Sequence, residues 1–334
     1  MTGEVVKRVA RACGFELAGV ALAEPVGDFA RYREWVDHGF AGEMRYLTDR
    51  RAEVRRDPRN LLGSARSIIC VGKLYNTEGP GDEVVSRYAW GEDYHRVMRD
   101  GLVRMVELLE REAGPFEHKV CVDTAPLLER SYAREAGLGW IGKNTCLIHE
   151  PLGSWFFLGE ILTSLEIEPD APPPDRCGSC TRCIDACPTE ALVPGGDEWT
   201  LDSNRCISYL TIELRGAIPE ARREEMGAHI FGCDICQDVC PWNRRAPVTE
   251  ELAFQARAIP ALENFAKLSV ESFHHTTRES PLARARHSGI LRNVSVAMGN
   301  LGLDRFRESL EELAASGEQV VAEHARWALK KLLE

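Results

Sequence analysis

The stretch Cys177-Gly-Ser-Cys-Thr-Arg-Cys-Ile-Asp-Ala-Cys187-Pro188 decides how the middle of this chain folds. A second run, Gly232-Cys-Asp-Ile-Cys-Gln-Asp-Val-Cys240-Pro241, repeats its ending, and Cys206 stands alone between the two runs. A tight loop with thiolates at this spacing wraps three iron corners of a cubane cluster, while the fourth ligand comes from elsewhere. The spacing therefore predicts iron–sulfur clusters.

Two 4Fe-4S clusters with exchanged ligands are expected, because in two-cluster ferredoxins the cysteine before proline ligates the other cluster. We assign the eight cysteines as follows: Cys177, Cys180, Cys183 and Cys240 to cluster A, and Cys187, Cys206, Cys233 and Cys236 to cluster B. The alternative is one or two structural zinc sites, although these usually pair two cysteine doublets. The other cysteines have apolar surroundings and are predicted to be ordinary buried thiols: Cys13, Cys70, Cys121 and Cys146.

The proline-rich segment 168–175 marks a domain boundary ahead of the cysteines. Before it, strands are predicted over 17–23, 67–72, 119–122 and 155–162, alternating with helices such as 94–113, which favours an α/β domain. Helices predicted over 290–301 and 320–333 weakly resemble each other, which suggests a HEAT-like module. We expect an α+β multidomain chain: an α/β domain over 1–167, a ferredoxin-like domain over 168–250 and a helical module over 251–334.

The chain has 334 residues, 12 cysteines and a formal net charge of −11. Its N-terminus resembles no export signal, so the cysteines suggest metal binding in a reducing cytoplasm rather than disulfides. No apolar run approaches the roughly 20 residues that span a bilayer, and no membrane contact is expected. The acidic total argues against broad nucleic-acid binding, although arginines outnumber acids over 43–66 and 271–307.

Three short motifs bear on chemistry. Gly137-Leu-Gly-Trp-Ile-Gly142 has the glycines of a dinucleotide fingerprint but follows a predicted helix, so we interpret it as a loop, either structural or facing a planar or anionic ligand. Asp93-Tyr-His95 begins like a cobalt-ligating corrinoid motif, but Met98 stands where glycine is needed. Asp123 follows a predicted strand, either as a proton donor or as the N-cap of the next helix.

Together these stretches resemble the epoxyqueuosine reductases, cobalamin-dependent iron–sulfur enzymes of tRNA queuosine synthesis. The resemblance covers almost the whole chain. Besides the two cysteine runs, it rests on Arg87-Tyr-Ala-Trp-Gly-Glu-Asp-Tyr-His95, Val122-Asp-Thr-Ala-Pro-Leu-Leu-Glu-Arg130, Gly139-Trp-Ile-Gly-Lys-Asn-Thr145, and the stretches 153–160 and 205–213.

The resemblance implies reduction of epoxyqueuosine to queuosine at the wobble position of a tRNA anticodon. Electrons would pass from an external ferredoxin or flavodoxin through two clusters to a base-off cobalamin without a histidine ligand, and Asp123 matches the proton donor. Cobalamin contacts are expected at Tyr46, Arg56, Tyr88, Trp140, Lys143, Asn144 and Ser208 of the N-terminal and cluster domains. Contacts with the anticodon stem-loop are expected at Arg284, Arg286 and Arg292. We expect a cytoplasmic monomer.

Three alternatives stay open on the residues alone. A corrinoid reductive dehalogenase shares the cofactor pair but usually carries an export signal. A ferredoxin-type electron-transfer protein leaves the residues before the proline-rich segment unexplained. A helical-repeat scaffold with structural metals predicts zinc in place of iron and cobalt. Whether cobalt attacks carbon or acts by electron transfer is not decided by the sequence.

Overall fold

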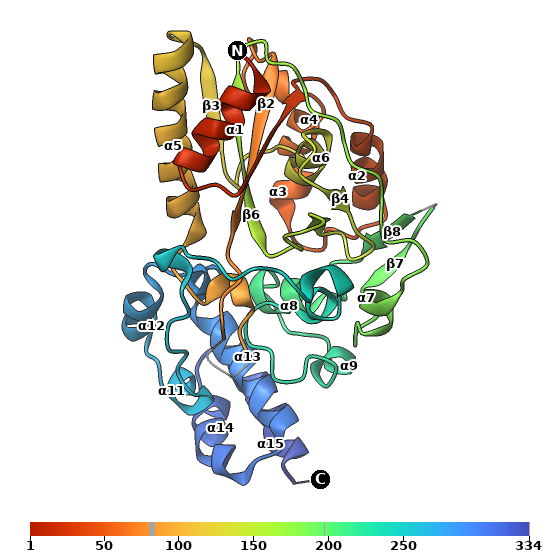
Figure 1. The fold of residues 1–334 in the computed structure, drawn as a ribbon. Helices are drawn as coiled ribbons and strands as arrows, with labels where there is room; N and C mark the ends of the chain where they lie inside the picture. Colours follow the sequence, from red (N-terminus) through yellow and green to blue (C-terminus); the bar gives the residue numbers. More distant parts are fainter. Residues whose placement is uncertain (80–83, 197, 334) are drawn as a thin grey trace.

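The computed structural model describes residues 1–79, 84–196 and 198–333. Figure 1 shows a sheet flanked by helices in the N-terminal part, loops and short helices in the middle, and packed helices toward the C-terminus. The figure also shows the loop-rich middle lying between the sheet and the C-terminal helices. Side chains from all three parts can therefore meet at their junction.

A four-stranded sheet forms the N-terminal part, in the order β1-β2-β6-β3. Its strands are β1 (Leu17–Leu22), β2 (Ser67–Leu74), β3 (His118–Cys121) and β6 (Phe156–Thr163). All four strands predicted from the sequence are present, with ends shifted by one or two residues. Every pairing in this sheet is antiparallel, so the sheet is not the parallel one that strands alternating with helices commonly form. The alternation of strands and helices along the chain does not decide the direction of a strand. Here every strand of the sheet runs antiparallel to its neighbours.

Helices cover both faces of the sheet. Apolar side chains of α1 (Gly3–Ala12) and α5 (Tyr94–Ala113) pack on one face, where Met98 and Leu102 are fully buried. On the other face, α6 (Glu129–Glu135) places Tyr132 against the sheet. Full burial of each such side chain contributes roughly 1.5–3 kcal/mol, which fixes both layers.

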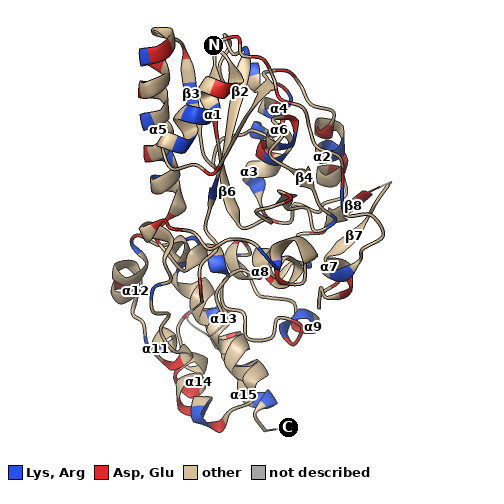
Figure 2. Cartoon of the chain, in the orientation of Figure 1, with Lys and Arg blue, Asp and Glu red and all other residues tan. Residues whose placement is uncertain are grey.

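Several short elements lie beside these layers. The segment after β1 forms α2 (Asp28–Asp37), α3 (Arg45–Thr48) and α4 (Arg51–Val54). After α6, a small hairpin joins β4 (Trp140–Ile141) to β5 (Leu147–Ile148). Acidic and basic residues are interspersed along α5, so the net negative charge is not concentrated there (Figure 2).

The cysteine-rich middle contains only short elements. Each cysteine run carries a one-turn helix, α7 (Arg182–Asp185) in the first and α10 (Ile235–Asp238) in the second, and the two helices pack together. Between them come the hairpin β7 (Leu192–Gly195) and β8 (Glu198–Leu201), then α8 (Ile207–Ile212) and α9 (Glu220–Arg223). The packing of α7 on α10 brings the two cysteine runs side by side.

The C-terminal helices are α11 (Leu262–Ala266), α12 (Val270–Thr277), α13 (Arg286–Leu301), α14 (Arg307–Ala314) and α15 (Gln319–Lys331). Helix α13 is central and largely buried. It packs closely on α15 at Gly299, where an added β-carbon would lie only 2.8 Å from the Ala328 side chain. The hydrophobic core of these helices also includes Trp90 and Phe231. Segments predicted in all three domains therefore share one core. Among the described residues, no helix combines the length and apolar character needed to cross a bilayer.

Candidate functional site

Four cysteines line one cavity of about 240 Å³: Cys177, Cys180, Cys183 and Cys240. They are the set that the spacing assigned to cluster A. The first three come from the loop around α7, and the fourth follows α10. Burial first, and then the neighbouring thiols of Cys177 and Cys240, raise the pKa of Cys183 to about 11. Exchange of one ligand between the two runs is thus compatible with the fold.

The other four cysteines form a second group. Burial raises the pKa of Cys233 to about 12, with further contributions from the thiols of Cys206 and Cys187. The Cys206 thiol, also buried, is a neighbour of Cys187, and Cys236 is a neighbour of both Cys233 and Cys206. Cys206, although distant in the sequence, therefore joins the group assigned to cluster B.

The thiols of these two groups are spread apart rather than gathered around one point. Within the described part of the chain, no three histidine, cysteine, aspartate or glutamate side chains converge closely enough to hold one metal ion. A structural zinc site needs four ligands within about 2.3 Å of one point. The buried Trp140 Nε1–H beside the cavity also lacks an acceptor among the described residues, and cluster sulfur can accept such a bond.

One of the four cysteines predicted to be bystanders lies in this site. Cys13, Cys70 and Cys121 are buried in the N-terminal cores, as expected. Cys146 instead forms a hydrogen bond with the thiol of Cys236, which lowers the pKa of Cys146. The sequence contains a signal for this contact, because Cys146 directly follows the Gly-Lys-Asn-Thr end of the glycine-rich loop.

The glycine-rich loop holds the cysteine runs. Lys143 Nζ donates to the carbonyl oxygens of Gly178 at 2.7 Å and Cys180 at 3.1 Å. Asn144 Nδ2 donates to the carbonyl oxygen of Cys236 at 3.2 Å, and Trp140 packs edge-on against Trp242. The loop follows α6 and enters the β4–β5 hairpin, so it is not a dinucleotide fingerprint. Whether these side chains also contact a corrin stays a prediction.

Asp123 lies in the turn after β3, and its side chain is 57% exposed. Its Oδ2 is 3.3 Å from Nε2 of His95, whose Nδ1 is 2.7 Å from Oδ1 of Asp93. Hydrogen bonds to Asp123 and Asp93 raise the pKa of His95 to about 9 despite its partial burial, so the ring is a cation at neutral pH. The interpretation of Asp123 as a helix N-cap is wrong, because Leu128 precedes α6.

Aromatic rings surround this group of charges. Tyr94 stacks on His95 with ring centres 4.2 Å apart, and Tyr88 meets Tyr94 edge-on at 6.3 Å. Burial, followed by the charge of Asp123, raises the pKa of Tyr88 and of Tyr94. The site combines an exposed carboxyl group, a cationic imidazole and protonated phenols, which is an arrangement suited to proton transfer.

Residues from the helical part reach the same site. Arg284 donates from Nε and Nη2 to the two carboxylate oxygens of Glu213, at 2.9 and 3.1 Å. Its guanidinium lies 5.4 Å from the ring centre of Tyr46. Burial and then the charge of Glu213 raise the pKa of Tyr46 to about 12, and Asp123 contributes further. The fold therefore brings Tyr46, Tyr88, Asp123 and Arg284 together from distant segments.

The remaining predicted residues are dispersed. Arg56 is exposed and pairs with Glu53, and Ser208 hydrogen-bonds to the Cys206 thiol. Arg286 is exposed at the first position of α13. Their ligand contacts stay predictions.

The expectation for Arg292 is corrected by the structure. Its side chain is 1% exposed and donates to the backbone carbonyl oxygens of Leu210, Leu214 and Gly216. A guanidinium saturated by internal acceptors has no donor left for phosphate. Arg292 therefore joins α13 to the segment around α8 instead of contacting tRNA.

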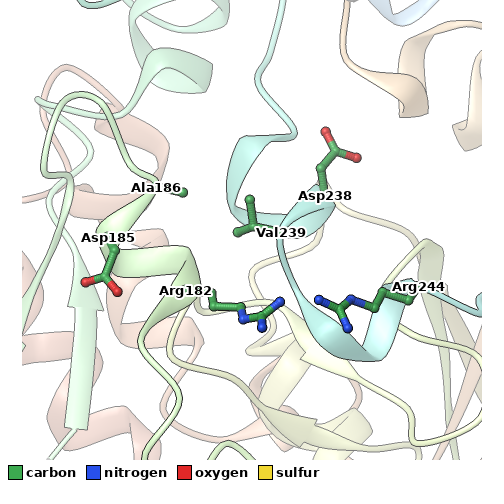
Figure 3. Close-up of a pocket in the computed structure, with 6 residues that line it drawn as sticks. All are labelled: Arg182, Asp185, Ala186, Asp238, Val239 and Arg244. Carbon is green, nitrogen blue, oxygen red and sulfur yellow. The ribbon is translucent and has the colours of Figure 1, made fainter.

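A second cavity, of about 470 Å³, opens where α7 meets α10. Figure 3 shows the guanidinium groups of Arg182 and Arg244 pointing toward one another across it. Arg182 also lines the cavity of the cluster A cysteines, and Arg244 follows Cys240 closely in the chain. Two carboxylates, Asp185 and Asp238, line the same cavity, so both cations and anions face it.

The comparisons with known proteins agree with this geometry. A family model described as 4Fe-4S double cluster binding domain matches residues 176–243, and one described as Epoxyqueuosine reductase QueG matches residues 55–124. An epoxyqueuosine reductase of Xanthomonas campestris is 40% identical over 97% of this chain and 94% of its own length.

Two solved structures are similar over the whole fold. One is an epoxyqueuosine reductase with an epoxyqueuosine-modified tyrosine tRNA stem loop (TM-score 0.90, 29% identity, 99% of this chain, 90% of that chain). The other is a Bacillus subtilis epoxyqueuosine reductase whose catalytic aspartate loop is swung out of the active site (TM-score 0.90, 28% identity, 98% and 90%). With a cluster domain, near-complete coverage and a shared fold, the chain belongs to the epoxyqueuosine reductase family.

Proposed function

We propose that this chain reduces epoxyqueuosine to queuosine in the anticodon of tRNA. The observation that carries the proposal is the exposed carboxyl group of Asp123 held 3.3 Å from a cationic His95, in a member of this family. Conversion of the epoxide into an alkene consumes two electrons and two protons and releases water. The site must therefore deliver protons to oxygen while electrons arrive from elsewhere.

Asp123 is the proposed proton donor. Protonation of the epoxide oxygen stabilises the negative charge that develops as the carbon–oxygen bond breaks. His95, protonated at neutral pH and fixed by Asp93, orients the Asp123 carboxyl group and can return a proton to it. We infer that the turn at 122–128 corresponds to the mobile catalytic loop of the Bacillus subtilis relative.

Eight cysteines are the proposed cluster ligands, in the two groups described above. The first group surrounds a cavity, and the second consists of mutually neighbouring thiols. When bound, each cluster supplies one-electron transfer. Lys143 and Asn144 fix the backbone of the ligand loops, and so would keep the thiols in place for assembly.

The residues present fit a cobalamin held without a histidine ligand. Both ring nitrogens of His95 are engaged by aspartates, so this histidine has no lone pair free for cobalt. When bound, cobalamin supplies the low-potential metal that reduces the epoxide carbon. Tyr46 and Tyr88, beside Asp123, are the proposed contacts nearest to the reacting group.

Arg284 and Arg286 are the proposed contacts with the anticodon stem-loop. Both are exposed, and Arg284 lies in the neighbourhood of Asp123. Arginine forks bind phosphate well, and an extruded base suits an active site beneath a flat cofactor. A tRNA substrate implies that the enzyme works in the cytoplasm.

A ferredoxin or flavodoxin is the proposed electron donor, docking at the cavity between Arg182 and Arg244. This cavity adjoins both cluster-bearing helices, so a donor seated there has a short path to the clusters. Carboxylates on the donor would complement the two guanidinium groups, and basic groups on it would face Asp185 and Asp238.

The proposal is tested in a bacterial strain that lacks its own epoxyqueuosine reductase and accumulates the epoxide. Expression of this chain should convert epoxyqueuosine into queuosine, as measured by nucleoside mass spectrometry of total tRNA. Persistence of epoxyqueuosine in the presence of purified, cluster-loaded protein and reductant would refute the proposal.

A further inference from the structure

Two carboxyl groups behind Asp123 have no role in the function proposed above. Glu129 begins α6, and Glu160 lies in β6, where its neighbours across the sheet are Cys70 and Cys121. Glu160 is fully buried, and no N–H or O–H group of a described residue donates to its carboxyl oxygens. An ionised carboxylate is strongly disfavoured there, so this glutamate needs a proton or a partner.

The partner of Glu160 is Glu129. Their side chains face each other closely enough for a carboxyl–carboxyl hydrogen bond, which forms when one of them carries a proton. Burial and then the charge of Glu129 raise the pKa of Glu160 far above its ordinary value. Burial and then the charge of Asp123 raise the pKa of Glu129 to about 7. Glu160 is thus the protonated donor, and Glu129 is the acceptor.

Glu129 also binds the backbone of the proposed proton donor. Its Oε1 accepts the backbone N–H of Asp123 at 2.7 Å. Asp123 has a φ of +53°, in the left-handed region that non-glycine residues rarely adopt. Because the Asp123 side chain is 57% exposed, packing of this side chain does little to hold the backbone conformation. The hydrogen bond from its backbone N–H to a charged acceptor can hold it instead.

We propose that Glu129, held by the protonated Glu160, is a positioning residue that keeps the turn at Asp123 in the conformation presenting its carboxyl group to His95 and the substrate. The inference rests on the proposed function, since Asp123 is the proton donor there. The other titratable or charged groups facing the pair are Asp123, Arg130, Tyr94, Cys70 and Cys121. Arg130 is exposed, so the shared proton, not a buried cation, holds the two carboxyl groups together.

Turnover of the holoenzyme on epoxyqueuosine tRNA tests the role of the pair. Glu129→Ala removes the acceptor, and kcat should fall on the order of 10-fold to 100-fold with an unchanged KM for tRNA, because misplacement of the acid affects the chemical step. Glu160→Gln keeps a donor for Glu129 and should retain more of kcat than Glu160→Ala. The matched control is Glu135→Gln at the other end of α6, where Glu135 pairs with Arg134.

Amide hydrogen exchange over 122–128 supplies a readout that does not depend on turnover. Exchange should be faster in Glu129→Ala, while β6 and α5 keep their protection. In the wild type, exchange corrected for its intrinsic rate should increase as the pH falls below about 7, where Glu129 takes up a proton and becomes a weaker acceptor. This pH dependence should be absent in Glu129→Gln, and a merely structural role of Glu129 does not predict it.

Wild-type kcat and exchange in Glu129→Ala would overturn the inference. If Glu129→Ala loses protection across the whole sheet, the Glu129→Gln variant is used for the test instead. An exchange profile over 122–128 in Glu129→Gln equal to that of the wild type at every pH would then overturn the inference. Failure of the wild type to reduce epoxyqueuosine would refute the proposed function instead, and the exchange measurements would still test the positioning of the turn.

Discussion

The Nε2 atom of His95 lies 3.3 Å from Oδ2 of Asp123, joining the first turn of α5 to the turn that follows β3. The two residues are 28 positions apart in the sequence, and the intervening helix and strand pack on one another. The Asp93 carboxylate on the opposite side of the ring fixes the imidazole between two anions. This arrangement makes His95 a cation and gives Asp123 a fixed neighbour.

His95 should make stability depend on pH in the alkaline range. Its pKa is raised from 6.5 to about 9 in the fold, so its contribution is fully present below pH 6.5 and is lost as the pH rises through about 9. The side chain is 39% exposed, and after a discount for solvent screening the contribution is roughly 1 kcal/mol. Urea unfolding at pH 6 and pH 9.5 should show this difference in the wild type and a smaller one in His95→Gln.

Asp123→Asn should abolish most turnover without loss of clusters or cobalamin. An amide cannot donate the proton, and general acid catalysis typically contributes about 100-fold to 10,000-fold in rate. Single-turnover assays with mass spectrometry of the nucleosides measure the effect. Asp100→Asn, an exposed change on α5, is the control, and full turnover by Asp123→Asn with intact cofactor spectra would exclude Asp123 as the acid.

Reversal of charge at Arg284 and Arg286 should weaken tRNA binding. Each phosphate contact that is lost should reduce the slope of log K against log salt by about 0.7–0.9. Arg286→Glu is the cleaner variant, because Arg284→Glu also faces Glu213. Filter binding of an anticodon stem-loop across a salt series measures both effects. Arg111→Glu on α5 is the control, and an unchanged slope in the double variant would remove this surface from the tRNA site.

Arg292→Met should act on stability and not directly on tRNA binding. The change leaves the carbonyl oxygens of Leu210, Leu214 and Gly216 without their buried donor. Each unsatisfied group costs about 1–3 kcal/mol, so a loss of at least about 3 kcal/mol is expected for the three. Thermal unfolding of the variant and of Arg326→Met, an exposed change on α15, provides the comparison.

Cys206→Ser should reduce the iron content of anaerobically reconstituted protein from about eight atoms per chain to about four, because one cubane loses a ligand. Cys13→Ser changes a buried thiol in the hydrophobic core of the N-terminal part and should leave iron unchanged. Iron analysis with EPR of the reduced protein distinguishes the two. Equal iron in both variants would show that Cys206 is not a ligand.

Local patterns were sufficient for much of the structure. The helix over 94–113 was predicted from its apolar stripe with its observed bounds, and the structure adds the capping Asp93 and the glycine that follows it, which also act within the segment. Cysteine spacing likewise predicted the cluster domain, since cubane geometry dictates how far apart thiolates can stand in a loop. These features depend on residues that are close together in the chain.

Long-range packing decided the rest. Periodicity shows which strand faces are apolar but not which way a strand runs, so the antiparallel sheet was not foreseen. Arg292 looks like any basic residue in the sequence, and only the carbonyl groups brought to it by the fold reveal its internal role. The sequence alone thus determined the elements, the cluster spacing and the family. The tertiary structure determined the strand directions and the meeting of His95, Asp123, Glu129 and Glu160, because hydrogen bonds between distant segments exist only once the chain has packed.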